Sequence, residues 1–156
     1  MALTANSVRG VFSKVLTDNT ATAVFTITTP TSDAAAAGAY SCHINLMVAN
    51  GYSASTHGAT SSKGLVVCFT RNVIRQGPAG ATSAVVELCE TGSAATSSAN
   101  RDLGTVTVTV TEISEFKVQV EVTADGTGAL AVALIAMCSV EVLWAGFASA
   151  PVLAQA

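Results

Sequence analysis

The stretch TVTVTVTEISEFKVQVEVT, residues 105–123, carries the strongest structural signal in the chain. Its first half alternates valine with threonine from Val106 to Val110, and its second half alternates apolar with polar residues from Phe116 to Val122. Because successive side chains of a β-strand point to opposite faces, this pattern predicts two strands that each bury one face. The opposite face of the first strand carries threonines and no charge, which raises the question of what that face meets.

The same alternation recurs along the rest of the sequence. Residues 40–51 give the best example, because the apolar residues from Tyr40 to Val48 share one parity and an Asn-Gly turn signal ends the segment. Residues 7–16 leave two interpretations open, an eighth strand or a short helix, since their apolar spacing suits a helix while Gly10 weakens it. Further strands are predicted at 21–30, 64–77, 84–90, 104–111, 116–123 and 129–143.

Seven or eight short strands without a strong helical pattern between them predict an all-β fold. We expect an antiparallel β-sandwich or jelly roll with extended terminal arms. The sandwich is expected to span residues 15–145. Residues 1–14 are expected to form an N-terminal arm or a first strand, and residues 146–156 a C-terminal arm.

The composition is unusual for an isolated soluble domain. Charged residues make up 11% of the chain, whereas an ordinary soluble domain has about 25%. Because surface charge keeps soluble proteins apart, we infer that other protein covers much of this surface. The net charge is −3 and the cations are scattered, so no nucleic-acid partner is expected.

Two other classes of protein have similar compositions. The only candidate membrane span, residues 129–154, alternates larger and smaller side chains from Leu134 to Trp144, a period for which a lipid-facing helix has no reason. Residues 1–16 lack the continuous apolar segment of a secretory signal peptide. We therefore expect a chain that is made in a cytoplasm and has no membrane partner.

Four cysteines are widely spaced and form no C-x-x-C pair: Cys42, Cys68, Cys89 and Cys138. Cys42 and Cys138 fall on predicted apolar strand faces, where a free cysteine acts as a small hydrophobic residue. Because the chain is not expected to be secreted, reduced cysteines are expected rather than disulfides.

No group of residues predicts a catalytic, cofactor-binding or metal-binding site. The segment GTGALA at 126–131 matches a dinucleotide-binding pattern, but only 25 residues follow it and its surroundings alternate as strands do. A turn is the better interpretation. Cys42 and His43 are adjacent and point to opposite faces, so they cannot bind one ion. The chain is therefore not expected to be an enzyme, and no cofactor is expected.

Two arginines in one predicted strand, Arg71 and Arg75, have the same parity. We expect them to meet Glu87 or Glu90 on a neighbouring strand. Such a pair is usually solvated or lies at an interface, so it does not indicate an anion site.

With these strands laid out, the sequence resembles small virion structural proteins of tailed bacteriophages. LTDNTATAVFTITTPTSDAAAAGAYSCHINLMVANG (16–51) is similar to the opening strands of β-sandwich domains in capsid decoration (cement) proteins and in tail or head fibres. GTVTVTVTEISEFKVQVEVTADGTGALAVALIAMCSVEVLWA (104–145) is similar to their closing strands. The resemblance covers most of residues 15–145. It implies a homotrimer on the capsid surface that is made in the host cytoplasm, binds across joints of the major capsid protein and stabilises the phage head.

The resemblance leaves rival functions open. A tail or head fibre domain that binds a receptor is the first alternative, although its loops would need more aromatic and charged residues than these Ser, Ala, Thr and Gly loops contain. A bacterial pilin or adhesin module is the second, and it would need a signal peptide. In the virion role, a neighbouring subunit covers the uncharged threonine face.

The chain ends contain more apolar residues than a disordered tail would use. Burial of one such side chain is worth roughly 1.5–3 kcal/mol, less the entropy of ordering the segment. We therefore expect both arms to lie on a neighbouring subunit or on the capsid. The candidate interface residues are Leu3, Val8, Val11, Phe12, Phe147, Val152 and Leu153.

Overall fold

The computed structural model describes residues 6–30, 38–50, 62–75, 81–93, 103–114, 116–126 and 134–156. Nine strands occur in these residues. They are β1 (Asn6–Leu16), β2 (Thr22–Thr28), β3 (Gly38–Asn50), β4 (Ser62–Arg75), β5 (Ala81–Ser93), β6 (Leu103–Ser114), β7 (Lys117–Gly126), β8 (Leu134–Ala145) and β9 (Val152–Gln155).

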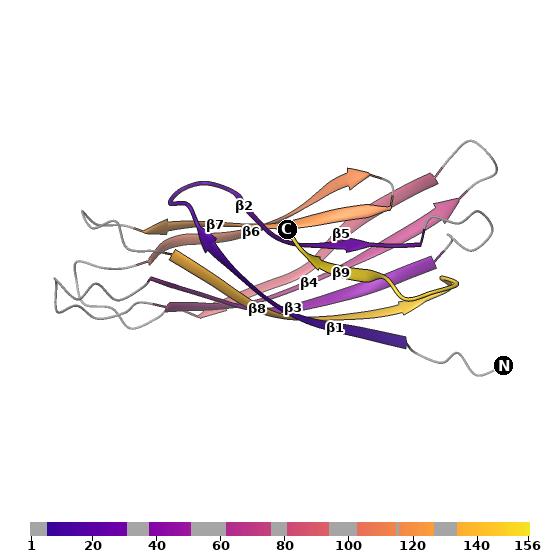
Figure 1. Cartoon of the computed structure of the whole chain (residues 1–156), viewed down its shortest axis with the longest axis horizontal. Coiled ribbons are helices and arrows are strands. Elements are labelled where there is room, and N and C mark those ends of the chain that lie inside the picture. The colour runs from indigo at the N-terminus through magenta and orange to yellow at the C-terminus, as the bar shows by residue number, and fades with distance from the viewer. Residues whose placement is uncertain are drawn as a thin grey trace.

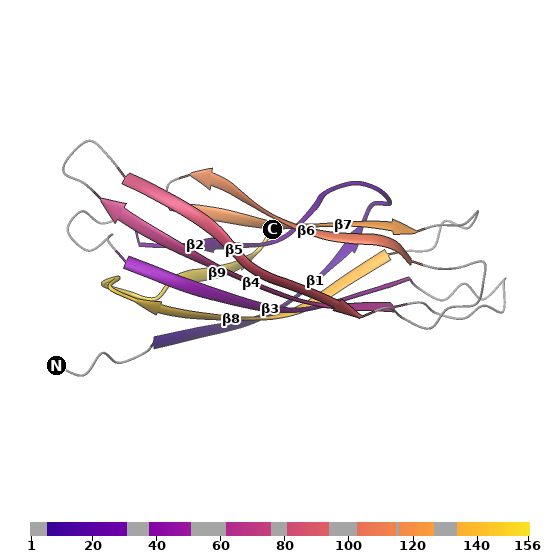
Figure 2. The same ribbon diagram turned by 180° about the vertical axis from the view of Figure 1, so that it is seen from behind.

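The strands form two antiparallel sheets that pack face to face (Figure 1). The five-stranded sheet has the order β1-β8-β3-β4-β5, and the four-stranded sheet has the order β6-β7-β2-β9. The reverse view shows the same two layers running along the length of the molecule (Figure 2). The predicted all-β antiparallel sandwich is therefore confirmed.

The N-terminal segment that was compatible with strand or helix is a strand. β1 pairs with β8 without a break, from Asn6 opposite Trp144 to Leu16 opposite Leu134. Its even-numbered residues face the other sheet and its odd-numbered residues face outward. The period of two prevails here because a strand can add to the edge of β8, which satisfies the backbone groups and buries Phe12.

The C-terminal segment also contributes a strand. β9 pairs with β2, from Phe25 opposite Gln155 to Thr28 opposite Val152. The strand number is consequently nine, one more than the upper number expected from the sequence. A four-residue strand of this kind is hard to predict, because its alternation covers only two residues on each face.

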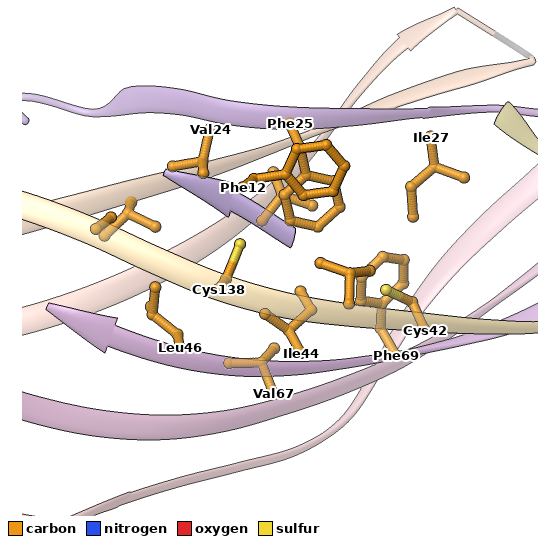
Figure 3. Packing of buried hydrophobic residues seen from close by; sticks show 14 of the residues in the cluster. Phe12, Val24, Phe25, Ile27, Cys42, Ile44, Leu46, Val67, Phe69 and Cys138 are labelled. Carbon is orange, nitrogen blue, oxygen red and sulfur yellow. The ribbon is translucent and has the colours of Figure 1, made fainter. Parts of the chain in front are cut away.

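The hydrophobic core lies between the two sheets (Figure 3). The rings of Phe12 and Phe25 stack in its centre with their centroids 5.0 Å apart, so they link β1 of one sheet to β2 of the other. Phe25 and Ile27 face inward as predicted, and both are fully buried. Cys42 and Cys138 are also in this core as free thiols. Burial raises the pKa of both thiols, that of Cys138 to about 11.

One charged side chain lies between the sheets. Arg71 of β4 is fully buried, and its Nη2 atom lies 3.1 Å from Oε1 of Glu112 on β6 of the opposite sheet. The same nitrogen donates a hydrogen bond to the backbone oxygen of Ser114 at 3.2 Å. Burial raises the pKa of the neighbouring Tyr40 to about 12, although Arg71 acts in the opposite direction.

The expectation that Arg71 lies in an exposed ion pair is wrong. Its parity is that of the buried residues Phe69 and Val73, so it must face the core. The side chains of Glu87 and Glu90, the partners expected on the neighbouring strand, lie outside the part of the chain whose side chains are described.

Candidate interaction surface

The outer face of the five-stranded sheet carries more apolar side chains than a surface in contact with water needs. On β1, Val11 and Val15 are 82% and 63% exposed. Met47 of β3 and Met137 of β8 lie opposite each other in the register, and both are exposed. Ile135 lies opposite Val15 and continues this apolar area towards the end of the two strands. We name these five residues the outer apolar patch.

A row of polar side chains crosses the same face beside the patch. Arg9 of β1 lies opposite Glu141 of β8, which in turn lies opposite His43 of β3. The guanidinium of Arg9 donates to Oε1 of Glu141 from Nη2 at 2.6 Å and from Nε at 2.9 Å. The two side chains are 74% and 34% exposed, so water weakens the pair and it contributes little to the stability of one chain.

A shallow hollow lies between the polar row and the outer apolar patch. Its volume is about 600 Å³, and short side chains such as Asn45 and Ser139 form its floor. Arg9, His43 and Glu141 line one part of it and Val11 another. The face therefore offers a cation, an anion and apolar contacts within a few residues of one another.

The threonine face of β6 belongs to the other sheet. Thr105, Thr107 and Thr109 are exposed there, while Val106 is buried, as the alternation predicts. Thr111 donates a hydrogen bond from Oγ1 to Oε2 of Glu121 on β7 at 2.8 Å. This face is polar and hydrogen-bonded, so it differs in character from the outer apolar patch.

The seven residues predicted to form an interface lie in different environments. Phe12 and Phe147 are buried in the core of their own chain, and Val8 and Leu153 are partly buried against it. Their burial is thus explained within one chain, and we do not keep them as interface candidates. Val11 and Val152 are exposed and remain candidates, whereas Leu3 lies outside the described residues. Only Val11 belongs to the outer apolar patch.

The C-terminal segment makes its contacts within the same chain. The side-chain nitrogen Nε2 of Gln155 donates to the backbone oxygens of Ser13 at 3.1 Å and Val24 at 2.9 Å. Nζ of Lys14 donates to the backbone oxygen of Ala156 at 2.6 Å. These bonds connect β9 to both sheets and close one side of the sandwich. The C-terminal arm therefore packs on its own sandwich, where the sequence suggested a neighbouring subunit.

The outward aliphatic residues of β3 and β8 were missed from the sequence. Attention to the inward parity of β8, from Leu134 to Trp144, left Met137 and Leu143 unassigned. Both have the opposite parity and are exposed. The signal that identifies them is the presence of large apolar residues on both parities of a strand that has only one buried face.

The described residues contain no group of three His, Cys, Asp or Glu side chains that is suited to hold a metal ion. Cys42 is buried and His43 is exposed, so the two lie on opposite faces as predicted. Within the same residues, no helix is long and apolar enough to cross a membrane.

Comparisons with known proteins give distant matches only. No family model and no curated protein matches the chain. Among solved structures, it is similar to the tailspike protein of Acinetobacter baumannii phage AM24, with 12% identity and a TM-score of 0.49 over 96% of this chain and 28% of that one. The tailspike of Acinetobacter phage vB_ApiP_P1 gives 15% identity and a TM-score of 0.40 over 100% of this chain and 23% of that one.

A third match is the tailspike gp49 of Acinetobacter baumannii bacteriophage Fri1, described as a capsular polysaccharide depolymerase. Its identity is 15% and its TM-score 0.34, over 97% of this chain and 19% of that one. The chain thus spans between a fifth and somewhat over a quarter of the tailspikes that it matches. These values are too low to assign a family or an activity. The chain is a distant structural match to a part of phage tailspike proteins.

Proposed function

We propose that this chain is a structural module of a bacteriophage tail spike or fibre and that it works as a homo-oligomer. The observation that carries the proposal is the outer apolar patch, which exposes aliphatic side chains in a protein with few charges. An exposed apolar area of this kind marks a surface that other protein covers. Within a virion, such a module contributes contacts between subunits and needs no chemistry of its own.

The choice of a virion rests on the resemblance of residues 16–51 and 104–145 to phage β-sandwich domains. That resemblance included fibres as well as capsid decoration proteins. The three solved structures reported above are tailspikes, which agrees with the tail, although the proposal does not rest on them. The cement role and binding to the major capsid protein stay predictions, because no described feature favours a capsid partner over a tail partner.

Labelling of phage particles tests the proposed location. Antibodies raised against the purified chain, followed by electron microscopy of intact particles, are expected to mark the tail. Label on the head would overturn the tail proposal in favour of the cement role. Particles that carry no label, from a lysate in which the chain is expressed, would overturn the virion role altogether.

A second test uses particles that lack the chain. In the tail role, heads should assemble and hold their genome on heating, while adsorption to cells falls. In the cement role, adsorption should be normal and the genome should be released at a lower temperature. Unchanged adsorption together with unchanged heat resistance would contradict both roles.

We also propose that the chain has no catalytic activity, nucleic-acid partner or membrane partner. The absence of a catalytic motif in the sequence and the scattered cations support this. The purified chain should release no reducing ends from capsular polysaccharide, the substrate named for one of the tailspikes above. Hydrolysis by the purified chain would contradict the proposal.

A further inference from the structure

The outer face of β1, β8 and β3 has the properties of a surface that binds another copy of this chain. We propose that neighbouring copies meet through this face, around a rotation axis that runs parallel to its strands. The inference rests on the proposed structural role, in which protein covers the face. It adds the identity of the partner and the arrangement of the two surfaces.

The first support is the exposure of the outer apolar patch. Val11, Val15, Ile135, Met47 and Met137 occupy three neighbouring strands within adjacent rows of the register. No described segment of the chain lies over them, because the other sheet packs on the opposite face (Figure 1). Burial of such side chains between copies gives a favourable free energy that an isolated chain does not gain.

The second support is the charge of the face, which favours a copy of itself over a charged partner. Among outward-facing residues on β1, β8, β3 and the described side chains of β4, the only Asp, Glu, Lys or Arg residues are Arg9 and Glu141. They neutralise each other, so a strongly acidic or basic partner would gain nothing from the face. A neutral polar row flanked by aliphatic residues suits an equally neutral surface.

The third support is that the polar row is complementary to its own copy. Rotation about an axis parallel to the strands keeps every row at the same height. An axis in front of β1 and β8 therefore brings Arg9 of one copy next to Glu141 of the following copy, and Val15 next to Ile135. This holds for a half turn and for a third of a turn, so it accommodates both a dimer and the trimer expected from the sequence.

The size of the face is sufficient for such an interface. Four strands of about eleven residues cover roughly 650 Å² of plane, at about 4.8 Å between strands and 3.4 Å per residue. Each partner in a standard protein interface contributes about 800 Å² of accessible surface. Since side chains add area to the plane, the two values agree.

Charge reversal tests the inference. The masses of the wild-type chain and its variants are to be measured by sedimentation over a range of concentrations. The wild type should associate to a whole multiple of 15.6 kDa. Arg9→Glu alone and Glu141→Arg alone should each weaken association at least about tenfold, because like charges then meet between copies. The double variant should restore it.

A mixture of the two single variants separates contacts between copies from the ion pair within one copy. Neither single variant contains a complementary pair within its own chain, yet an Arg9→Glu chain complements a Glu141→Arg chain. We expect the mixture to associate more tightly than either variant alone. Failure of mixing to restore association would overturn the inference, because it would show that the pair acts within one chain only.

A matched pair of lysine substitutions tests the apolar part. Met137→Lys places a charge in the outer apolar patch, and Ile113→Lys places one at an exposed aliphatic residue of β6 in the other sheet. Met137→Lys should weaken association at least about tenfold and Ile113→Lys should not. Equal effects, or a wild-type chain that remains a monomer at high micromolar concentration, would overturn the inference. If copies associate as predicted but no particle carries the chain, only the virion role fails.

Discussion

The two faces of the five-stranded sheet carry similar residues that have different consequences. The inner face holds Ile44 and Arg71, which are buried, and the outer face holds Met47 and Arg9, which are exposed. Each arginine has a glutamate partner, Glu112 on the opposite sheet for the inner one and Glu141 on the next strand for the outer one. The inner face stabilises the fold of one chain, whereas the outer face is available to other protein.

The largest expected difference concerns two apolar residues of β3. Ile44→Ala should lower the free energy of unfolding by about 2–5 kcal/mol, because it leaves a cavity between Val140 and Val67 of the neighbouring strands. Met47→Ala, three residues further along the same strand, should change it by less than about 0.5 kcal/mol in dilute solution. Denaturant unfolding followed by circular dichroism measures both. Equal losses would contradict the assignment of the two faces.

The two ion pairs give a somewhat smaller difference. Glu112→Gln should destabilise the chain by about 1–3 kcal/mol, since it leaves a buried guanidinium with a weaker acceptor and water reaches only the glutamate side of the pair. Glu141→Gln should cost less than about 0.5 kcal/mol. The same unfolding measurement applies.

A double variant sharpens this prediction. Arg71→Met with Glu112→Leu removes both charges, and it should be more stable than Glu112→Gln alone, because no buried charge is left without its partner. A double variant that is less stable than Glu112→Gln would show that the guanidinium itself is needed between the sheets.

A glycine of β1 provides a third comparison of inner and outer positions. A Cβ atom at Gly10 would lie 2.8 Å from two ring carbons of Phe12, whose ring stacks on Phe25 and cannot easily move. Gly10→Ala should therefore cost about 1–2 kcal/mol of stability through overpacking. Ser13→Ala, on the outward parity of the same strand, is the control and should change stability by less than about 0.5 kcal/mol. A Gly10→Ala variant as stable as the wild type would contradict the close packing.

The smallest effect appears only at alkaline pH. Tyr40 and Cys138 on the inner face have pKa values raised by burial to about 12 and about 11, from ordinary values of 10.0 and 9.0. Above pH 9 the unfolded chain loses these protons before the folded chain does, so stability falls as pH rises towards 12. Tyr40→Phe should make this fall less steep. Melting temperatures measured across that range check it, and a fall of unchanged steepness would contradict it.

The fold was largely predictable because burial imposes a period of two on the sequence. Residues 105–123 and 40–51 show this period clearly, and their strands lie where they were expected. The predicted strand at 129–143 corresponds to β8, while residues 129–133 lie outside the described part. Short segments such as β9 were not predicted, since four residues carry too little periodicity and their place depends on the edge that β2 offers.

The surface was harder to predict than the fold. The low charge content indicated that protein covers the molecule, but it did not show where. Phe12 and Phe147 appeared to be surplus apolar residues of the termini until the register placed them in the core. Met47 and Met137 come next to each other only through the pairing of β3 with β8, which the sequence does not state.

Methionine oxidation tests most directly whether the outer face is covered. The chain contains three methionines, and Met47 and Met137 lie in the outer apolar patch. Brief oxidation of dilute and of assembled protein, followed by mass spectrometry of peptides, reports how accessible each one is. We predict that both methionines are oxidised rapidly in dilute protein and are protected in the assembly. Equal oxidation of Met47 and Met137 in the two states would contradict an interface on this face.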